Sequence, residues 1–294
     1  MTTLQNKIDF AVIFSVKNAN PNGDPLNGNR PRTDYANYGE MSDVSIKRKI
    51  RDRLLERWVS AGKKGDGNMI FVQSDDRKAD KEKSLRARAE ATLGKELGGE
   101  KTAELACKTW IDVRAFGQLF AFKSNKKAGK KKEDGSDEDG DTGVSIGIRG
   151  PVTVQSAFSV EPIDVTSLQI TKSVSGEGDG TKRGADTMGM KHRVDKGVYV
   201  FFGSMNPQLA EKTLFSDADA VVIKAVLPRL FENDEAAARP AGSMEVHKVF
   251  WWSHNCKSGQ YSAAKVHRTL AVGHDGSYTL ADLPGLAPEI LDGF

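Results

Sequence analysis

The chain has 294 residues, of which 38% are hydrophobic and 28% are charged, with a formal net charge of +3 at pH 7. This size allows one large domain with insertions or two small domains. No run approaches the roughly eighteen apolar residues of a membrane-spanning helix, and the N-terminal segment MTTLQNKIDF lacks the apolar stretch of a signal peptide. We therefore expect a cytoplasmic protein without a membrane contact. Cys107 and Cys256 are the only cysteines and lie far apart, which excludes a disulfide framework.

Residues 8–16 (IDFAVIFSV) are expected to form the first strand. Apolar side chains alternate onto both of its faces: Phe10, Val12, Phe14 and Val16 on one, Ala11 and Ile13 on the other. A strand that is apolar on both faces is typical of the centre of a covered sheet.

Residues 18–40 are expected to form a long loop after this strand. The segment holds two proline-flanked turns, NPNGDP and GNRPR, which break regular structure. Loops of this length are usually functional or disordered. Amide and guanidinium groups can donate hydrogen bonds to phosphate oxygens and 2′-hydroxyls of RNA. The candidate RNA contacts in the loop are Asn20, Asn22, Arg30 and Arg32.

A helix is expected to follow Ser42, which suits the N-cap position, with Asp43 favourably placed in the first turn. One apolar stripe runs along it at i, i+4 spacing: Ile46, Ile50, Leu54 and Trp58. A basic helix beside an amide-rich loop is suited to holding a polyanion, and Lys47, Arg48 and Arg51 are the candidate RNA contacts on this helix. A solvated helix with ordinary surface charges is the alternative.

Residues 61–102 are expected to form an inserted, mostly helical segment. It begins with the polar turn AGKKGDGN and a short strand, IFVQ, and continues as a charged, alanine-rich helix over 75–97 that GGE ends. Residues 103–122 are apolar and partly helical, which indicates a return to the core. The low-complexity run 123–142 is expected to be a mobile surface loop, and its basic part leaves a contact with nucleic acid open.

Residues 144–160 are expected to contain one or two strands, bent at a GP pair. Residues 166–196 then read as a strand, a glycine-rich tip and a returning strand, which predicts a long protruding hairpin. The basic candidate contacts in the hairpin are Lys172, Lys191, His192 and Arg193. Met188 and Met190 lie near the return and suit packing against a base or a neighbouring subunit. The alternative is that both methionines pack the arm onto its own domain.

The remaining core elements are expected in the last third of the chain. Strands are expected at 197–203 and 244–253, with a helix between them that Ser216 caps and Asp219 completes as a capping box. Short strands are expected at 263–272 and 277–280, followed by an irregular, proline-containing tail. The core order is then βαββαβ, the α+β order of the ferredoxin-like fold that the RNA recognition motif shares.

Few residues in the sequence suggest catalysis or metal binding. The chain has no P-loop, no GxSxG elbow and no HExxH motif, and His254 with Cys256 supplies too few ligands for a metal site, so neither a metal nor another cofactor is expected. Asp24 and Asp34 could position a metal for RNA cleavage, but aspartate is also an ordinary turn residue. The strands lack the aromatic signature of base stacking, which favours contact with the RNA backbone over base readout.

Four segments resemble one known family. NPNGDP followed by GEMSDVSIKRKIRD, and later WIDVRAFGQLFA and GIRGPVTVQSAFSVEP, resemble the backbone subunit of the type I CRISPR surveillance complex (Cascade), closest to subtype I-C. The resemblance implies a fold likened to a right hand, with an RNA-recognition-like palm, a helical finger insertion and a β-hairpin thumb. The implied division is palm at 1–60, 103–165 and 197–294, finger at 61–102 and thumb at 166–196.

The resemblance also implies roles and partners. Lys47 and Arg51 match the palm-helix positions that grip the guide backbone, Asn20 and Asn22 match the adjoining loop, and Met188 or Met190 is the candidate wedge at a kinked base. Several copies would polymerise along one CRISPR RNA and present its bases to target DNA, beside other Cascade subunits and a separate helicase-nuclease. The subunit would be non-catalytic. Related type III subunits cut target RNA with a loop aspartate, which keeps a metal-dependent ribonuclease as the alternative.

Overall fold

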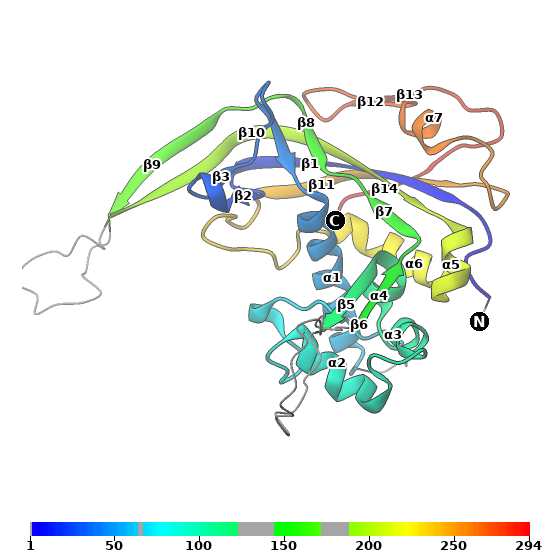
Figure 1. Cartoon of the computed structure of the whole chain (residues 1–294). Coiled ribbons are helices and arrows are strands. Elements are labelled where there is room, and N and C mark those ends of the chain that lie inside the picture. Colours follow the sequence, from blue (N-terminus) through cyan, green and yellow to red (C-terminus); the bar gives the residue numbers. More distant parts are fainter. Residues whose placement is uncertain (1, 64–66, 123–143, 172–187) are drawn as a thin grey trace, which may run out of the picture. The chain divides into compact units, whose positions relative to one another are not determined.

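The computed structural model describes residues 2–63, 67–122, 144–171 and 188–294 (Figure 1). The chain divides into two compact units, each assembled from three separate segments. The first unit contains Met1–Gln5, Leu54–Thr153 and Asn206–Val221, and the second contains Asn6–Arg53, Val154–Met205 and Val222–Phe294. The expected mobile loop at 123–142 and the tip of the hairpin lie outside the described residues. No helix in the described part of the chain is long and apolar enough to span a membrane.

The second unit is built on a large antiparallel sheet around β1 (Ile8–Ala19). Its strands run in the order β14-β11-β1-β10-β8-β4. The neighbours of β1 are β10 (Met188–Met205) and β11 (Met244–Ser253), and the outer strands are β8 (Ala157–Pro162), β4 (Tyr38–Met41) and β14 (Glu289–Asp292). One of the points where the chain passes from one unit to the other falls in β7 (Val152–Val154). The prediction that the first strand lies at the centre of a sheet is therefore confirmed.

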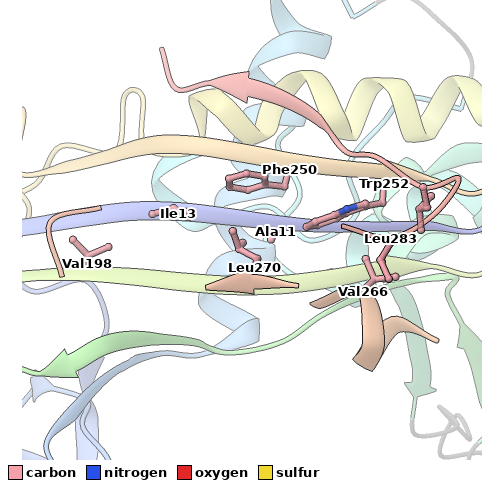
Figure 2. Packing of buried hydrophobic residues seen from close by; sticks show 9 residues of the cluster. Ala11, Ile13, Val198, Phe250, Trp252, Val266, Leu270 and Leu283 are labelled. Atoms are coloured by element: carbon pink, nitrogen blue, oxygen red, sulfur yellow. The ribbon is translucent and has the colours of Figure 1, made fainter. Parts of the chain in front are cut away.

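Aromatic and aliphatic side chains cover both faces of β1. On one face Phe14 stacks on Tyr199 with 5.3 Å between ring centroids and tilts against Phe231 at 5.1 Å. The opposite face carries a separate buried cluster, which Figure 2 shows converging from β1, β10, β11 and the C-terminal segment: Ala11, Ile13, Val198, Phe250, Trp252, Val266, Leu270, Leu283 and Leu286. Burial on both faces explains why this strand has no polar alternation.

The expected loop at 18–40 contains more regular structure than its turn residues suggest. It folds as a small β2–β3 ladder (Gly23–Asp24 and Arg30–Pro31) around a 3₁₀ turn at Pro25–Asn27, and it ends in β4. Helix α1 (Asp43–Ser60) follows, and the Ser42 hydroxyl accepts a hydrogen bond from Ser45 N at 3.3 Å. The predicted N-cap is confirmed, while β4 was missed because its partner, β8, lies far along the chain.

The first unit has its own helical core. Its helices are α2 (Leu85–Leu93), α3 (Thr102–Thr109), α4 (Ile111–Phe116) and α5 (Pro207–Thr213), with the hairpin β5–β6 (Gly117–Phe122 and Val144–Arg149). A buried cluster joins α2, α3, α4 and β5, and it consists of Phe71, Ala89, Leu93, Ala106, Cys107, Trp110, Val113 and Phe120. Free cysteines are usually buried, and Cys107 is a core residue, whereas Cys256 is exposed.

Two local predictions in this unit are wrong. IFVQ is not a strand, because the amides of Phe71 and Val72 donate to the buried carboxylate of Asp112 at 2.7 and 3.0 Å instead of to a neighbouring strand. A continuous helix was expected over 75–97, but only α2 is α-helical, and it lies between 3₁₀ turns at Asp75–Arg77 and Gly94–Glu96. The chain before α2 bends so that the Asp80 carboxylate accepts two bonds from the Arg88 guanidinium, at 2.6 and 2.9 Å.

The C-terminal part confirms one prediction and corrects two. Helix α6 (Asp217–Val226), which runs into a 3₁₀ turn at Leu227–Arg229, starts with the predicted capping box: Ser216 N donates to Asp219 at 2.9 Å and Asp219 N donates to Ser216 Oγ at 3.2 Å. The segment expected as a strand at 263–272 begins as α7 (Ala263–His267) and only ends in β12 (Leu270–Val272), which pairs with β13 (Tyr278–Leu280). The tail is not irregular, because β14 pairs with β11.

Candidate nucleic-acid interface

The amides of Asn20 and Asn22 are used inside the protein. Asn20 is buried, its side-chain nitrogen donates to the Asn29 carbonyl at 2.7 Å, and its Oδ1 has no partner in the described part of the chain. Asn22 Oδ1 accepts hydrogen bonds from both the backbone N and the hydroxyl of Ser42, each at 2.9 Å. The two asparagines therefore fasten the loop to itself and to the start of α1.

The predicted cations of α1 are paired with nearby groups. Lys47 Nζ lies 2.8 Å from the Asp43 carboxylate and Arg48 Nε lies 3.7 Å from Asp52, both at i, i+4 spacing. Arg51 is half-buried and also has a partner. These contacts offset much of the positive charge that the sequence concentrates on this helix.

Lys49, in the middle of the same basic run, is buried. Its ammonium contacts the Asp234 carboxylate, which also accepts a 2.9 Å bond from Arg239 Nε. Burial lowers the pKa of Lys49 to about 8, against the attraction of Asp234, which raises it. Through Asp234, Lys49 joins the segment after α6 to α1. The apolar stripe at 46, 50, 54 and 58 did not indicate that this lysine is buried.

The hairpin pairs β9 (Val165–Thr171) with the first half of β10, from Val165 opposite Val194 to Thr171 opposite Met188. Both strands extend beyond the rest of the sheet of their unit (Figure 1). Because side chains alternate along a strand, Met188, Met190 and His192 share one face of β10. Met188 and Met190 are 65% and 57% exposed, so neither packs the arm firmly onto its own unit. Lys172 lies outside the described residues.

Arg30 from the loop meets the base of the hairpin. Arg30 Nη1 donates to the hydroxyl of Ser167 at 2.8 Å, and His192 Nδ1 lies 2.9 Å from the same oxygen. Ser167 and His192 are directly opposite each other in the β9–β10 ladder. Sequence reasoning singled out Arg30 and His192 separately and missed Ser167, because only the strand register brings the three together.

The cations near this junction differ in how they are neutralised. Arg32 Nη2 lies 3.5 Å from Asp24, and Arg193 Nε lies 3.6 Å from Asp195. Within the described part of the chain, Arg30, Lys191 and His192 have no carboxylate at ion-pair distance. The uncompensated positive charge therefore lies at the loop and hairpin base more than on α1.

The two loop aspartates form turns. Asp24 Oδ1 accepts the amide of Leu26 at 3.2 Å and so caps the 3₁₀ turn. Asp34 Oδ1 accepts the amides of Ala36 and Tyr38, both at 2.9 Å. These bonds are those of ordinary Asx turns, and they give each carboxylate a structural role.

His254 belongs to a buried charge cluster and not to a metal site with Cys256. Its Nδ1 accepts the amide of Gln260 at 2.9 Å, so Nε2 carries the proton that it donates to Asp9, also at 2.9 Å. Burial raises the pKa of Asp9, but contacts with His254, His267 and Lys7 outweigh it and hold the pKa well below its usual range. The residues described contain no group of three or more His, Cys, Asp or Glu side chains that could hold a metal ion.

Comparisons with known proteins agree with this architecture. A family model described as CRISPR-associated protein Cas7 matches residues 6–282. A CRISPR-associated protein Cas7 from Haloferax volcanii is 25% identical over 303 residues, which cover 99% of this chain and 82% of that protein.

The fold also resembles a solved structure. A chain of the structure described as "CRISPR RNA-guided surveillance complex, pre-nicking" has a TM-score of 0.50 and 16% identity, covering 92% of this chain and 84% of that one. The match to the family model confirms, at the level of the family, the resemblance noted in the sequence motifs. Because the family model spans most of its length, the chain belongs to the Cas7 family of CRISPR-associated proteins.

Proposed function

We propose that this protein is a non-catalytic subunit that binds CRISPR RNA and polymerises along it as the backbone of a type I-C Cascade complex. The observation that carries the proposal is the arrangement of basic and exposed apolar side chains at the base of the hairpin. The hairpin base carries Arg30, Lys191 and His192, none of which has a carboxylate partner among the described residues. His192, which meets Arg30 through Ser167, shares its face of β10 with the exposed side chains of Met188 and Met190, and Lys191 lies on the opposite face. Positive charge next to exposed apolar surface suits a nucleotide, which offers a phosphate and a base.

The strand order supports an RNA-recognition-like palm. Numbering β1, β8, β10 and β11 as the four core strands gives the sheet order 4-1-3-2, all antiparallel, with α1 after the first strand and α6 after the third. This is the connectivity of a βαββαβ ferredoxin-like unit. In the proposed division, 1–60, 103–165 and 197–294 form the palm, 61–102 the finger and 166–196 the thumb.

The palm contacts follow from the same proposal. The loop around Asn20, Asn22 and Arg32 would position the guide backbone through its amide and guanidinium groups. One flank of α1 adds Lys47, Arg48 and Arg51, and the carboxylate partners of Lys47 and Arg48 would be exchanged in part for RNA phosphates. Such contacts hold an RNA strand without reading its sequence.

The proposed partners are those of a guide-holding filament in the cytoplasm. They are CRISPR RNA, target DNA paired with the exposed guide bases, further copies of this chain, other Cascade subunits and a recruited helicase-nuclease. We assign no catalytic step to the chain, because Asp24 and Asp34 hold turns and no observation favours a metal-dependent ribonuclease. The family match supports the backbone role and does not distinguish subtype I-C from others.

RNA binding tests the proposal directly. Purified protein, stripped of nucleic acid, is titrated with two unrelated single-stranded RNAs of equal length at several salt concentrations. We expect similar affinities for both RNAs and a negative slope of log K against log salt, because phosphate contacts release counterions. Lys191→Gln should lower the magnitude of that slope by about one, and Arg268→Gln, an exposed cation near α7, should leave it unchanged. Absence of RNA binding, or a strong preference for one sequence, would overturn the proposal.

A further inference from the structure

We propose that Arg30, Ser167 and His192 form a single phosphate-binding site at the base of the hairpin. This inference rests on the proposed RNA-binding function and says where one phosphate of the RNA is held. It also assigns a role to Ser167, a residue that no motif in the sequence indicates.

Three elements build the site. Arg30 comes from β3, Ser167 from β9 and His192 from β10, and 137 residues separate the first two in sequence. The ladder fixes Ser167 opposite His192, and the Arg30 guanidinium is held 2.8 Å from the serine hydroxyl. The two paired strands therefore fix Ser167 against His192, and the serine hydroxyl holds the Arg30 guanidinium beside them before any ligand arrives.

The hydrogen bonds leave donors unused. Arg30 Nη1 donates to Ser167 Oγ, and the serine proton can then go to Nδ1 of a neutral His192 ring, 2.9 Å away. The neutral ring keeps its proton on Nε2, and the guanidinium retains further N–H groups that bond to no described residue. If the ring is protonated, Nδ1 donates to the serine and the serine proton becomes available instead. In both states several donors face no acceptor in the described structure.

The charge of the site favours an anion. Arg30 and His192 have no carboxylate at ion-pair distance among the described residues, whereas Arg32 and Arg193 nearby are paired with aspartates. A guanidinium with free parallel N–H groups matches the oxygens of a phosphate well.

Neighbouring side chains favour a nucleotide phosphate over a free anion. Met190 and Met188 continue along the same face of β10 from His192, in steps of about 6.8 Å. Both thioether side chains are exposed, so a base attached to the bound phosphate would find apolar contact there. The face thus presents an anion site at one end and apolar surface at the other.

The salt dependence of RNA binding distinguishes one shared phosphate from two separate ones. The slope of log K against log salt counts the phosphates that the protein neutralises. The titrations are run at pH 5.5, below the reference pKa of about 6.5 of a histidine side chain. If Arg30 and His192 hold the same phosphate, the double variant Arg30→Gln/His192→Gln should then lower the magnitude of the slope by about one. Two independent contacts would lower it by about two, which would overturn the single site.

Ser167→Ala tests the bridge between the two basic groups. It keeps both cations, so the slope should stay at the wild-type value, while the loss of one hydrogen bond weakens RNA binding between about twofold and tenfold. An unchanged affinity of Ser167→Ala for RNA would show that the serine does not contribute to the site. Arg268→Gln is the matched charge control and should bind RNA as the wild type does.

The outcomes separate this inference from the proposed function. If the wild-type protein binds no RNA, the proposed function fails. If the wild type binds RNA and the double variant keeps the full slope, only the phosphate site fails. Arg30 and His192 are partly exposed, so the variants should fold, which circular dichroism and the melting temperature check.

Discussion

The hydrogen bonds between Asn22 in the loop and Ser42 before α1 predict how far the free energy of unfolding falls when they are removed. Asn22 Oδ1 accepts two hydrogen bonds from Ser42, whose hydroxyl in turn caps α1 through Ser45 N. Asn22→Ala removes both bonds and leaves two donors at the helix start without this acceptor. At about 1 kcal/mol for each bond, the free energy of unfolding should fall by about 2 kcal/mol. With a urea m-value of about 2 kcal/mol/M, the midpoint should fall by about 1 M.

Urea unfolding followed by circular dichroism measures this shift, and hydrogen exchange at Ser42 N reports the same bond locally. Asn22→Asp is the control, because it keeps the acceptor oxygen and adds a negative charge at the N-terminus of α1, which is favourable by roughly 0.3–1 kcal/mol. Its midpoint should be equal to or above that of the wild type. If Asn22→Asp unfolds as early as Asn22→Ala, or if Asn22→Ala leaves the midpoint unchanged, Oδ1 does not hold the loop.

Three further predictions follow from buried or turn-forming groups. Asp9→Asn should lower the free energy of unfolding by about 3–5 kcal/mol at pH 7, because it removes the buried carboxylate that the Lys7 ammonium and the His254 N–H contact. Since the folded-state pKa of Asp9 is depressed, its contribution is present above the unfolded value of about 4 and is lost as pH falls, so wild type and variant should converge in acid; a constant difference would contradict this. Gly39→Ala places a Cβ 2.1 Å from the Tyr199 hydroxyl and should cost about 1–3 kcal/mol, seen as a lower melting temperature, and part of the loss should return with Tyr199→Phe. Asp24→Asn and Asp34→Asn should leave RNA intact in magnesium, as the wild type does on a denaturing gel; wild-type cleavage that either variant abolishes would restore the ribonuclease hypothesis.

Elements with a local signal could be predicted from the sequence. The first strand, the N-cap at Ser42 and the capping box of Ser216 with Asp219 all depend on residues within a few positions of one another. The strand predicted at IFVQ is absent because the amides of this segment bond to Asp112, about forty residues away. Strand β14 was not predicted because it forms only by pairing with β11. Such elements are decided by long-range pairing, which propensity alone does not contain.

The candidate site was predictable in its residue types but not in its arrangement. The basic run on α1 indicated an RNA-facing helix, yet Lys47 is paired with Asp43 and Lys49 is buried against Asp234. In the hairpin, His192 was singled out for its charge, while its link to Arg30 depends on Ser167 and the strand register. Charge can be counted along a sequence, but neutralisation of that charge is a property of the folded chain.

The central claim is that copies of this chain assemble along an RNA. The most direct measurement is an electron-microscopic image of the particle purified after co-expression with a CRISPR array and the other Cascade subunits. We expect a helical assembly of repeated subunits that contains RNA of uniform length. A particle that holds single copies of the chain, or one that carries no RNA, would contradict it.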